Sequence, residues 1–213
     1  CLEKIDASAH FLMDMLTDVL YIIRLDAGEN ILRKSSVDLK ELFDSLSDTA
    51  RAMACEKRLN FFVHFDEQIV PLVQTDGSRV RQVLQNLLSN AIKFSDPGSD
   101  ILLSIKTSES SDQLSIYVCD SGIGMDTQQK QNIFTPFYQA PDSDRRLLGS
   151  GIGLSLVKLS AEAMGGWVEV HSFKGEGSVF IVHLPRKCSG EAVESLDMSK
   201  YSLDLYVGES SEK

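Results

Sequence analysis

The most informative stretch of this chain is Asn86-Leu87-Leu88-Ser89-Asn90-Ala91-Ile92-Lys93-Phe94. On a helix, at about 100° per residue, Asn86, Asn90 and Lys93 lie within roughly 60° of one another, and Arg79 and Gln82 extend the same polar row. The opposite side carries the apolar residues Val83, Leu84, Leu87, Leu88, Ala91 and Ile92. The pattern therefore predicts a helix that packs against a core and presents a narrow row of amide and cationic groups.

This polar row suits a hydrated metal ion beside a polyphosphate. Amide oxygen is a hard ligand of the kind that Mg²⁺ prefers, and lysine supplies positive charge. An ordinary amphipathic helix with a solvated polar face has the same spacing, so the row alone leaves both interpretations open.

Two glycine-rich segments follow further along the chain. Asp120-Ser121-Gly122-Ile123-Gly124 comes directly after the alternating stretch 114–119, which predicts a strand, and Gly149-Ser150-Gly151-Ile152-Gly153-Leu154 leads into a helical pattern over 157–164. Glycine permits close backbone approach, and the N–H groups at a helix start can bind anions. Neither segment is a Walker loop, because no Gly-Lys-Ser/Thr follows, and the second comes after a polar loop rather than a strand, unlike a dinucleotide fingerprint.

The order of these motifs is more specific than any one of them. The asparagine helix, then Asp120-x-Gly122-x-Gly124, then Phe134-x-Pro136-Phe137, then Gly149-x-Gly151-x-Gly153-Leu154 resembles the N, G1, F and G2 boxes of sensor histidine kinases. The ending Gly175-Glu176-Gly177-Ser178-Val179-Phe180, closed by Leu184-Pro185, resembles the last glycine box and the final strand of the same ATP-binding domain. The resemblance runs from about residue 12 to residue 187.

The resemblance implies that ATP and Mg²⁺ bind here. The implied nucleotide-binding residues are Asn86, Asn90, Lys93, Phe94, Asp120, Gly122, Gly124, Arg145, Arg146, Gly149, Gly151, Gly153 and Leu154. Asn90 is the implied Mg²⁺ ligand, Asn86 and Lys93 would assist at the metal-bound water and the phosphates, and Asp120 would accept a hydrogen bond from the adenine amine. The polar loop 134–150 is the implied lid over the nucleotide, with the two arginines inside it.

The identity of Asn86 separates two reaction classes. ATPases resembling DNA gyrase, mismatch-repair proteins and the large heat-shock chaperone place a glutamate four residues before the metal-binding asparagine, where it activates water. An asparagine cannot act as a base at neutral pH, so transfer to a protein nucleophile is favoured over hydrolysis. The alternatives are a nucleotide-binding regulatory module without catalysis and, less favoured, an ATPase of this superfamily.

The phosphate acceptor of the family is a histidine in a His-Glu/Asp-x-x-x-Pro motif. None of the four histidines (His10, His64, His171 and His183) has these neighbours, so we assign no catalytic residue and expect the acceptor outside this chain. The implied partners are the protein's own phosphoacceptor helix and the receiver domain of a response regulator, with a homodimer expected for the full-length protein.

Composition narrows the class of protein further. The chain has 213 residues, 43% of them hydrophobic and 24% charged, which is typical of a globular protein. Its net charge of −10 argues against nucleic acid as a partner, and no apolar run approaches the length of a membrane span. The four cysteines are scattered without a Cys-x-x-Cys pair, which favours a reducing, cytoplasmic location; a longer protein could still be anchored in a membrane elsewhere.

Periodicity predicts one long amphipathic helix over residues 1 to about 27, with an apolar side wide enough to need a partner helix. Arg24-Leu25-Asp26-Ala27-Gly28 resembles the end of the second dimerisation helix of histidine kinases, so the resemblance implies that residues 1–30 are that helix; a core helix of a single globular domain is the alternative. The resemblance also implies that residues 31–188 form the catalytic ATP-binding domain, and residues 189–213 are expected to be an acidic tail or linker. Within the domain, strands are predicted at 36–39, 60–65, 73–76, 101–107, 113–119, 167–172 and 178–184, and helices at 39–57, after Asp76, at 125–132 and at 157–164. The expected fold is α/β, a two-layer sandwich of a mixed, mostly antiparallel sheet and three helices.

Overall fold

The computed structural model describes residues 32–66, 69, 72–107, 113–140 and 150–185. Its elements, in chain order, are β1 (Ser35–Asp38), α2 (Leu39–Glu56), β2 (Asn60–Phe65), β3 (Leu72–Thr75), α3 (Gly77–Phe94), β4 (Asp100–Thr107), β5 (Gln113–Asp120), α4 (Thr127–Asn132), α5 (Gly153–Ala163), β6 (Trp167–Phe173) and β7 (Gly177–Pro185). The expectations for residues 1–30, for Arg145, Arg146 and Gly149, and for the tail 189–213 lie outside these residues.

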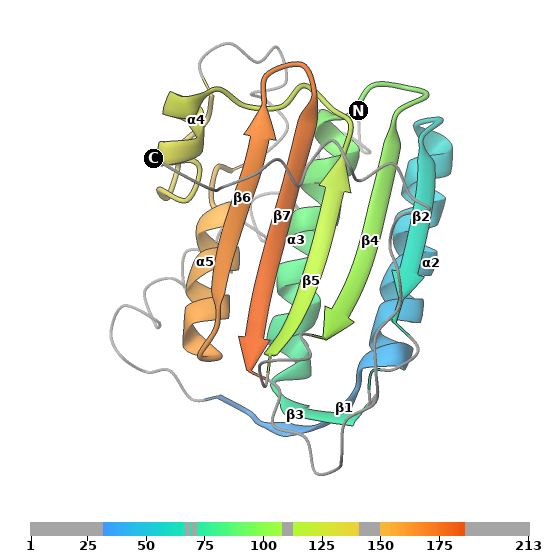
Figure 1. Cartoon of the computed structure of the whole chain (residues 1–213), viewed down its shortest axis with the longest axis vertical. Helices are drawn as coiled ribbons and strands as arrows, with labels where there is room; N and C mark the ends of the chain where they lie inside the picture. The colour runs from blue at the N-terminus through green and yellow to red at the C-terminus, as the bar shows by residue number, and fades with distance from the viewer. Residues whose placement is uncertain (1–31, 67–68, 70–71, 108–112, 141–149, 186–213) are drawn as a thin grey trace, which may run out of the picture.

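Five strands form the main sheet, in the order β2-β4-β5-β7-β6 (Figure 1). The pairs β4–β5, β5–β7 and β6–β7 are antiparallel, whereas β2 pairs with β4 in parallel. The mixed, mostly antiparallel sheet and its two predicted hairpins are therefore confirmed. The short strands β1 and β3 lie apart from it and pair with each other in a second, two-stranded antiparallel sheet.

Three long helices, α2, α3 and α5, lie on one face of the main sheet and give the molecule two layers (Figure 1). The core lies between the layers, and its fully buried members include Leu39, Phe43, Leu84, Leu87, Ile101, Leu103, Ile105, Ile116, Leu156 and Val182. The fourth described helix, α4, has only six residues and lies near the end of β6, where Lys130 stands over the ring of Phe173. No helix in the described part of the chain is long and apolar enough to cross a membrane.

Both ends of α3 are held by side chains. At its start, Oδ1 of Asp76 accepts a hydrogen bond from the backbone N–H of Arg79 at 3.2 Å, which confirms the predicted N-cap. At its end, Nζ of Lys57 donates to the carbonyl oxygens of Ile92 (2.7 Å) and Lys93 (2.8 Å). These carbonyls have no partner within the helix, so Lys57 satisfies them and ties α2 to the end of α3.

Candidate nucleotide-binding site

The predicted polar row lies on the side of α3 that the sheet does not cover. Asn86, Asn90 and Lys93 are half-buried, while the apolar positions between them belong to the core. Arg79 does not continue the row: it is only 8% exposed, and its Nε lies 3.4 Å from Oδ2 of Asp76. The expectation for Arg79 was therefore wrong, because this arginine is drawn back to the carboxylate that caps its own helix.

The start of α5 lies against the asparagine row. A Cβ added to Gly153 would lie 2.5 Å from Oδ1 of Asn86. The absence of a side chain at residue 153 therefore allows the start of α5 to lie this close to α3. The amide nitrogen of Asn86 donates to the carbonyl of Gln82 at 3.0 Å. Ile152, at the N-cap position of α5, makes no side-chain cap hydrogen bond, and a helix start of this kind favours anions. The start of α5 and the asparagine row thus present N–H and amide groups side by side, a combination that suits phosphate oxygens.

Lys93 adds a cation near the end of α3. Its Nζ lies 4.6 Å from the centroid of the Phe94 ring, a distance that allows a cation–π contact. Partial burial lowers the pKa of the Lys93 ammonium below its usual value, because the charged form loses water. A bound anion would restore the lost stabilisation of that charge.

Asp120 ends β5 and is 7% exposed. Burial raises the pKa of Asp120 to about 6, although backbone hydrogen bonds from Gly122 and Ser178 act in the opposite direction. The bond from the N–H of Gly122 reaches Oδ1 at 2.9 Å. A buried carboxylate has capacity for several hydrogen bonds, so Asp120 is suited to accept one more from a ligand amine.

The glycines after Asp120 pack against backbone from two other elements. A Cβ on Gly122 would lie 2.6 Å from the carbonyl oxygen of Phe94, and one on Gly124 would lie 1.8 Å from the carbonyl oxygen of Phe173. Gly124 also has a φ of +59°, in the left-handed region. These close approaches bring the loop after β5 to the end of α3 and to the β6–β7 turn.

The two ends of the predicted lid meet. The N–H of Phe137 donates to the carbonyl oxygen of Gly151 at 2.9 Å, and both residues have positive φ, +64° and +74°. Phe137 is 61% exposed, whereas Phe134 and Leu154 are half-buried and pack against the core. The F and G2 motifs, separated by the loop, are therefore joined at its base.

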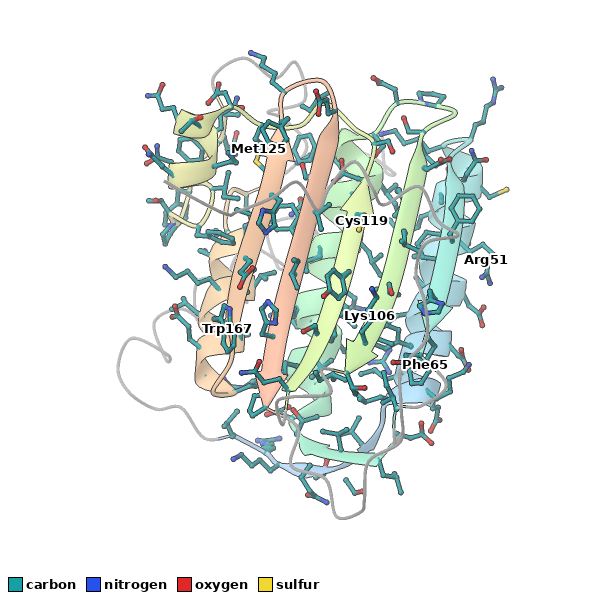
Figure 2. All side chains as sticks on the ribbon, viewed as in Figure 1. Arg51, Phe65, Lys106, Cys119, Met125 and Trp167 are labelled. Atoms are coloured by element: carbon teal, nitrogen blue, oxygen red, sulfur yellow. The ribbon has the colours of Figure 1, made fainter. Side chains whose placement is uncertain are left out.

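Most of these parts lie toward one end of the molecule. Figure 1 shows the end of β5, the end of α3 and α4 at that end, with the start of α5 further down, beside the middle of α3, and Figure 2 places Met125 near α4. The opposite end holds a small cavity of about 20 Å³ lined by Leu32, Lys34, Gln74, Thr75, Asp76, Met164 and Pro185, which has room for a water molecule but not for a nucleotide.

This combination of fold and motifs identifies the family. The model of the family described as histidine kinase-, DNA gyrase B-, and HSP90-like ATPase matches residues 75–187. The chain belongs to this ATPase family. The matched range runs from the end of β3 to just beyond β7 and includes every described residue of the candidate site.

Relatives of this ATPase-family chain are named sensor kinases or sensory proteins. The autoinducer 2 sensor kinase/phosphatase LuxQ of Vibrio cholerae is 36% identical over 84% of the chain, and the sensory/regulatory protein RpfC of Xanthomonas campestris is 32% identical over 92%. The chain spans only 21% of the length of LuxQ and 27% of the length of RpfC. It is thus homologous to one region of much longer proteins.

A solved structure with the same fold is full-length ShkA in complex with AMPPNP. It superposes with a TM-score of 0.74 at 28% identity, over 84% of this chain and 37% of ShkA. The agreement confirms the expected fold class of the ATPase family, with α4 as a short addition to the three sheet-covering helices.

The described part of the chain has no group of three His, Cys, Asp or Glu side chains that could hold a metal ion. Mg²⁺ commonly takes only one or two protein oxygens and completes its shell with phosphates and water, so the amide oxygens of the asparagine row are of a kind that Mg²⁺ accepts.

One contribution to the site was missed by the sequence analysis, and a second was noted only as part of a motif and not as a site residue. Lys57 holds the end of α3 that carries Lys93, and nothing in its local sequence indicates this long-range contact. Gly177 has a φ of +102°, and a Cβ there would lie 1.9 Å from the carbonyl oxygen of Asp120. The glycine-rich turn before β7 was the available signal for the second contribution.

Proposed function

We propose that this chain is the ATP-binding catalytic region of a sensor histidine kinase, which transfers the γ-phosphoryl group of ATP to a histidine outside the chain. The sensor-kinase relatives support this proposal. The observation that carries it is the identity and environment of Asn86. Its amide nitrogen donates to Gln82 and its oxygen faces Gly153, so the position from which related ATPases activate water holds no basic group.

The residues of the chain have positioning and electrostatic roles in this proposal. Asn90 would bind Mg²⁺ through its amide oxygen, and the N–H groups at the start of α5 together with Lys93 would hold phosphate oxygens. Bound Mg²⁺ supplies charge neutralisation at the transferring phosphoryl group. Asp120 would accept a hydrogen bond from the amine of adenine, and that amine is absent at the equivalent position of guanine.

Other contacts follow from the family resemblance. Arg145 and Arg146 would reach the phosphates from the lid, and Gly149 would form its far end. The phosphoacceptor helix of the same protein would receive the phosphoryl group, and the receiver domain of a response regulator would take it next. A homodimer and a cytoplasmic location for the catalytic region complete the proposal.

Labelling of the full-length protein with γ-labelled ATP tests this function. A kinase should acquire acid-labile, alkali-stable phosphate on a histidine, and Asn90→Ala should abolish it. Gln85→Ala, an exposed substitution on the same helix outside the polar row, is the matched control and should label normally.

The alternatives give different results in the same assay. Release of inorganic phosphate without histidine labelling would support an ATPase. Binding of ATP with neither reaction would support the regulatory module. Either result would contradict the proposed transfer.

A further inference from the structure

The main sheet has a second face, opposite the helices, that no described element covers. Figure 1 is viewed onto this outer face, and Figure 2 shows Trp167, Cys119 and Lys106 on three of its strands. Strand register gives the other members, since residues two apart on one strand share a face. The outer face comprises Asn60, Phe62 and His64 on β2, Asp100, Leu102, Ser104 and Lys106 on β4, Gln113, Ser115, Tyr117 and Cys119 on β5, Val179, Ile181, His183 and Pro185 on β7, and Trp167, Glu169, His171 and Phe173 on β6.

The β7 part of the outer face is more apolar than a solvated sheet face should be. An antiparallel sheet with one wet face alternates apolar and polar residues, whereas continuous apolar runs are typical of strands covered on both sides. In β7, Phe180 and Val182 belong to the core beneath the helices, and Val179 and Ile181 between them are also apolar. At the edges of this face, Phe62 is 49% exposed and Trp167 is 41% exposed.

Two polar atoms of the outer face are buried without a hydrogen bond in the described structure. They are Oγ of Ser104, a residue that is 1% exposed, and Nε2 of His183. The second atom lies 3.4 Å from Oε1 of Glu169 without hydrogen-bond geometry, while the His183 ring stacks on Trp167 at 4.6 Å. Buried polar atoms are normally paired, so both are suited to a chain that lies over this face.

We propose that residues 201–207, Tyr-Ser-Leu-Asp-Leu-Tyr-Val, cover the outer face. Alternation would turn Tyr201, Leu203, Leu205 and Val207 to one side, as a segment lying on an apolar surface requires. Seven extended residues span about 23 Å, close to the width of a five-stranded sheet at about 4.8 Å per strand. The length of the segment therefore matches the surface that lacks a cover.

The length of the connection fits the same occupant. The chain leaves β7 at Pro185, and the 15 residues 186–200 can extend to about 50 Å, whereas the nine residues of β7 are only about 30 Å long. The reach of this connection therefore allows residues 201–207 to return to the middle of the outer face.

Solvent access to two groups of the outer face tests the proposal in the full chain. Trp167 is the single tryptophan of the sequence, so acrylamide quenching of fluorescence reports on it alone. Alkylation of Cys119, read by peptide mass, gives a second and independent probe. Leu203→Ser/Leu205→Ser should raise both rates by at least about twofold, because the segment would leave the surface more often.

The matched control alters the other side of the same segment. Ser202→Ala/Tyr206→Ser should leave both rates unchanged, and circular dichroism should show the same helix and strand content in every variant. Equal rates in all variants would overturn the proposal. So would rates that depend on protein concentration, which would indicate a second copy of the chain, or faster amide exchange confined to β6, which would indicate pairing at the sheet edge.

Discussion

The side-chain oxygen of Asn86 lies 2.5 Å from the position that a Cβ of Gly153 would occupy. This contact joins the middle of α3 to the first residue of α5, so the asparagine row and the start of α5 form one surface. A larger residue at position 153 could not fit without moving the Asn86 side chain. The geometry of the proposed phosphate site therefore depends on the pair.

Gly153→Ala tests this dependence. The new methyl group should force the Asn86 amide to rotate and lose its bond to Gln82, at a cost of about 1 kcal/mol, partly offset by the better helix propensity of alanine. We expect nearly unchanged stability in urea unfolding but a loss of ATP affinity of about tenfold, measured by titration calorimetry. In an Asn86→Ala background the same substitution should have no further effect on affinity, and an unchanged penalty there would show that the two residues act independently.

Asp120→Asn should weaken ATP binding by roughly 1–3 kcal/mol, the usual cost of losing a buried hydrogen-bond acceptor. The affinity of the original chain should also fall as the pH drops below about 6, because that is the pKa of buried Asp120 and its protonated form is a poorer acceptor. Calorimetric titrations between pH 5 and 7.5 measure both effects. A pH profile that is the same in the two proteins would remove Asp120 from the site.

Asp120 should also make folding stability depend on pH, with the opposite sign to a salt-bridged aspartate. Burial raises its pKa from 3.8 to about 6, so the folded state binds more protons than the unfolded state between these values. The stability that this group contributes is present below about pH 4 and is lost as the pH rises to about 6. The free energy of unfolding should fall by roughly 2–3 kcal/mol over that interval. Urea unfolding of the original chain and of Asp120→Asn should show this slope only in the former.

Lys93 and Lys57 both lie near the end of α3 but should behave differently. Lys93→Ala should lower ATP affinity by about tenfold with little change in stability, since a half-buried ammonium gains from a bound phosphate. Lys57→Ala should cost about 1–2 kcal/mol of stability, because two helix-end carbonyls lose their donor, and should affect affinity less. Unfolding by Lys93→Ala would instead assign that lysine a structural role.

Gly124 and Gly175 form a second matched pair. Both have positive φ, +59° and +86°, but a Cβ on Gly124 would lie 1.8 Å from the Phe173 carbonyl, whereas one on Gly175 would meet nothing within 4 Å. Gly175→Ala should cost about 1–2 kcal/mol through backbone strain alone, and Gly124→Ala clearly more, because the loop itself must move. Thermal unfolding should separate the two, and equal losses would mean that close packing at Gly124 is unimportant.

Elements with strong local patterns could be predicted from the sequence. The alternation of Phe61, Val63 and Phe65 gives β2 its correct bounds, and Asp76 marks the start of α3 because a side-chain cap is a local interaction. The parallel pairing of β2 with β4 could not be predicted in the same way. It joins strands that are separated by α3, and their register depends on how the helices pack.

In the candidate site, too, features with a local pattern could be predicted and long-range contacts could not. The residue types and their order were sufficient for the ATPase family, because four motifs had to occur in sequence. The burial of Arg79 was missed, since helical spacing alone cannot say which cation a neighbouring carboxylate will attract. The contact between Asn86 and Gly153 depends on the packing of α3 and α5, which spacing along one chain does not encode.

The hydrogen bond between Phe137 and Gly151 makes the segment between them exchangeable. Because the bond closes the loop at its base, the helices on either side are held at a distance that does not depend on how many residues lie between. Doubling the length of such a loop costs only about 0.6 kcal/mol in closure entropy. A segment of another length or sequence could therefore stand between Phe137 and Gly151 while the rest of the domain keeps its sequence.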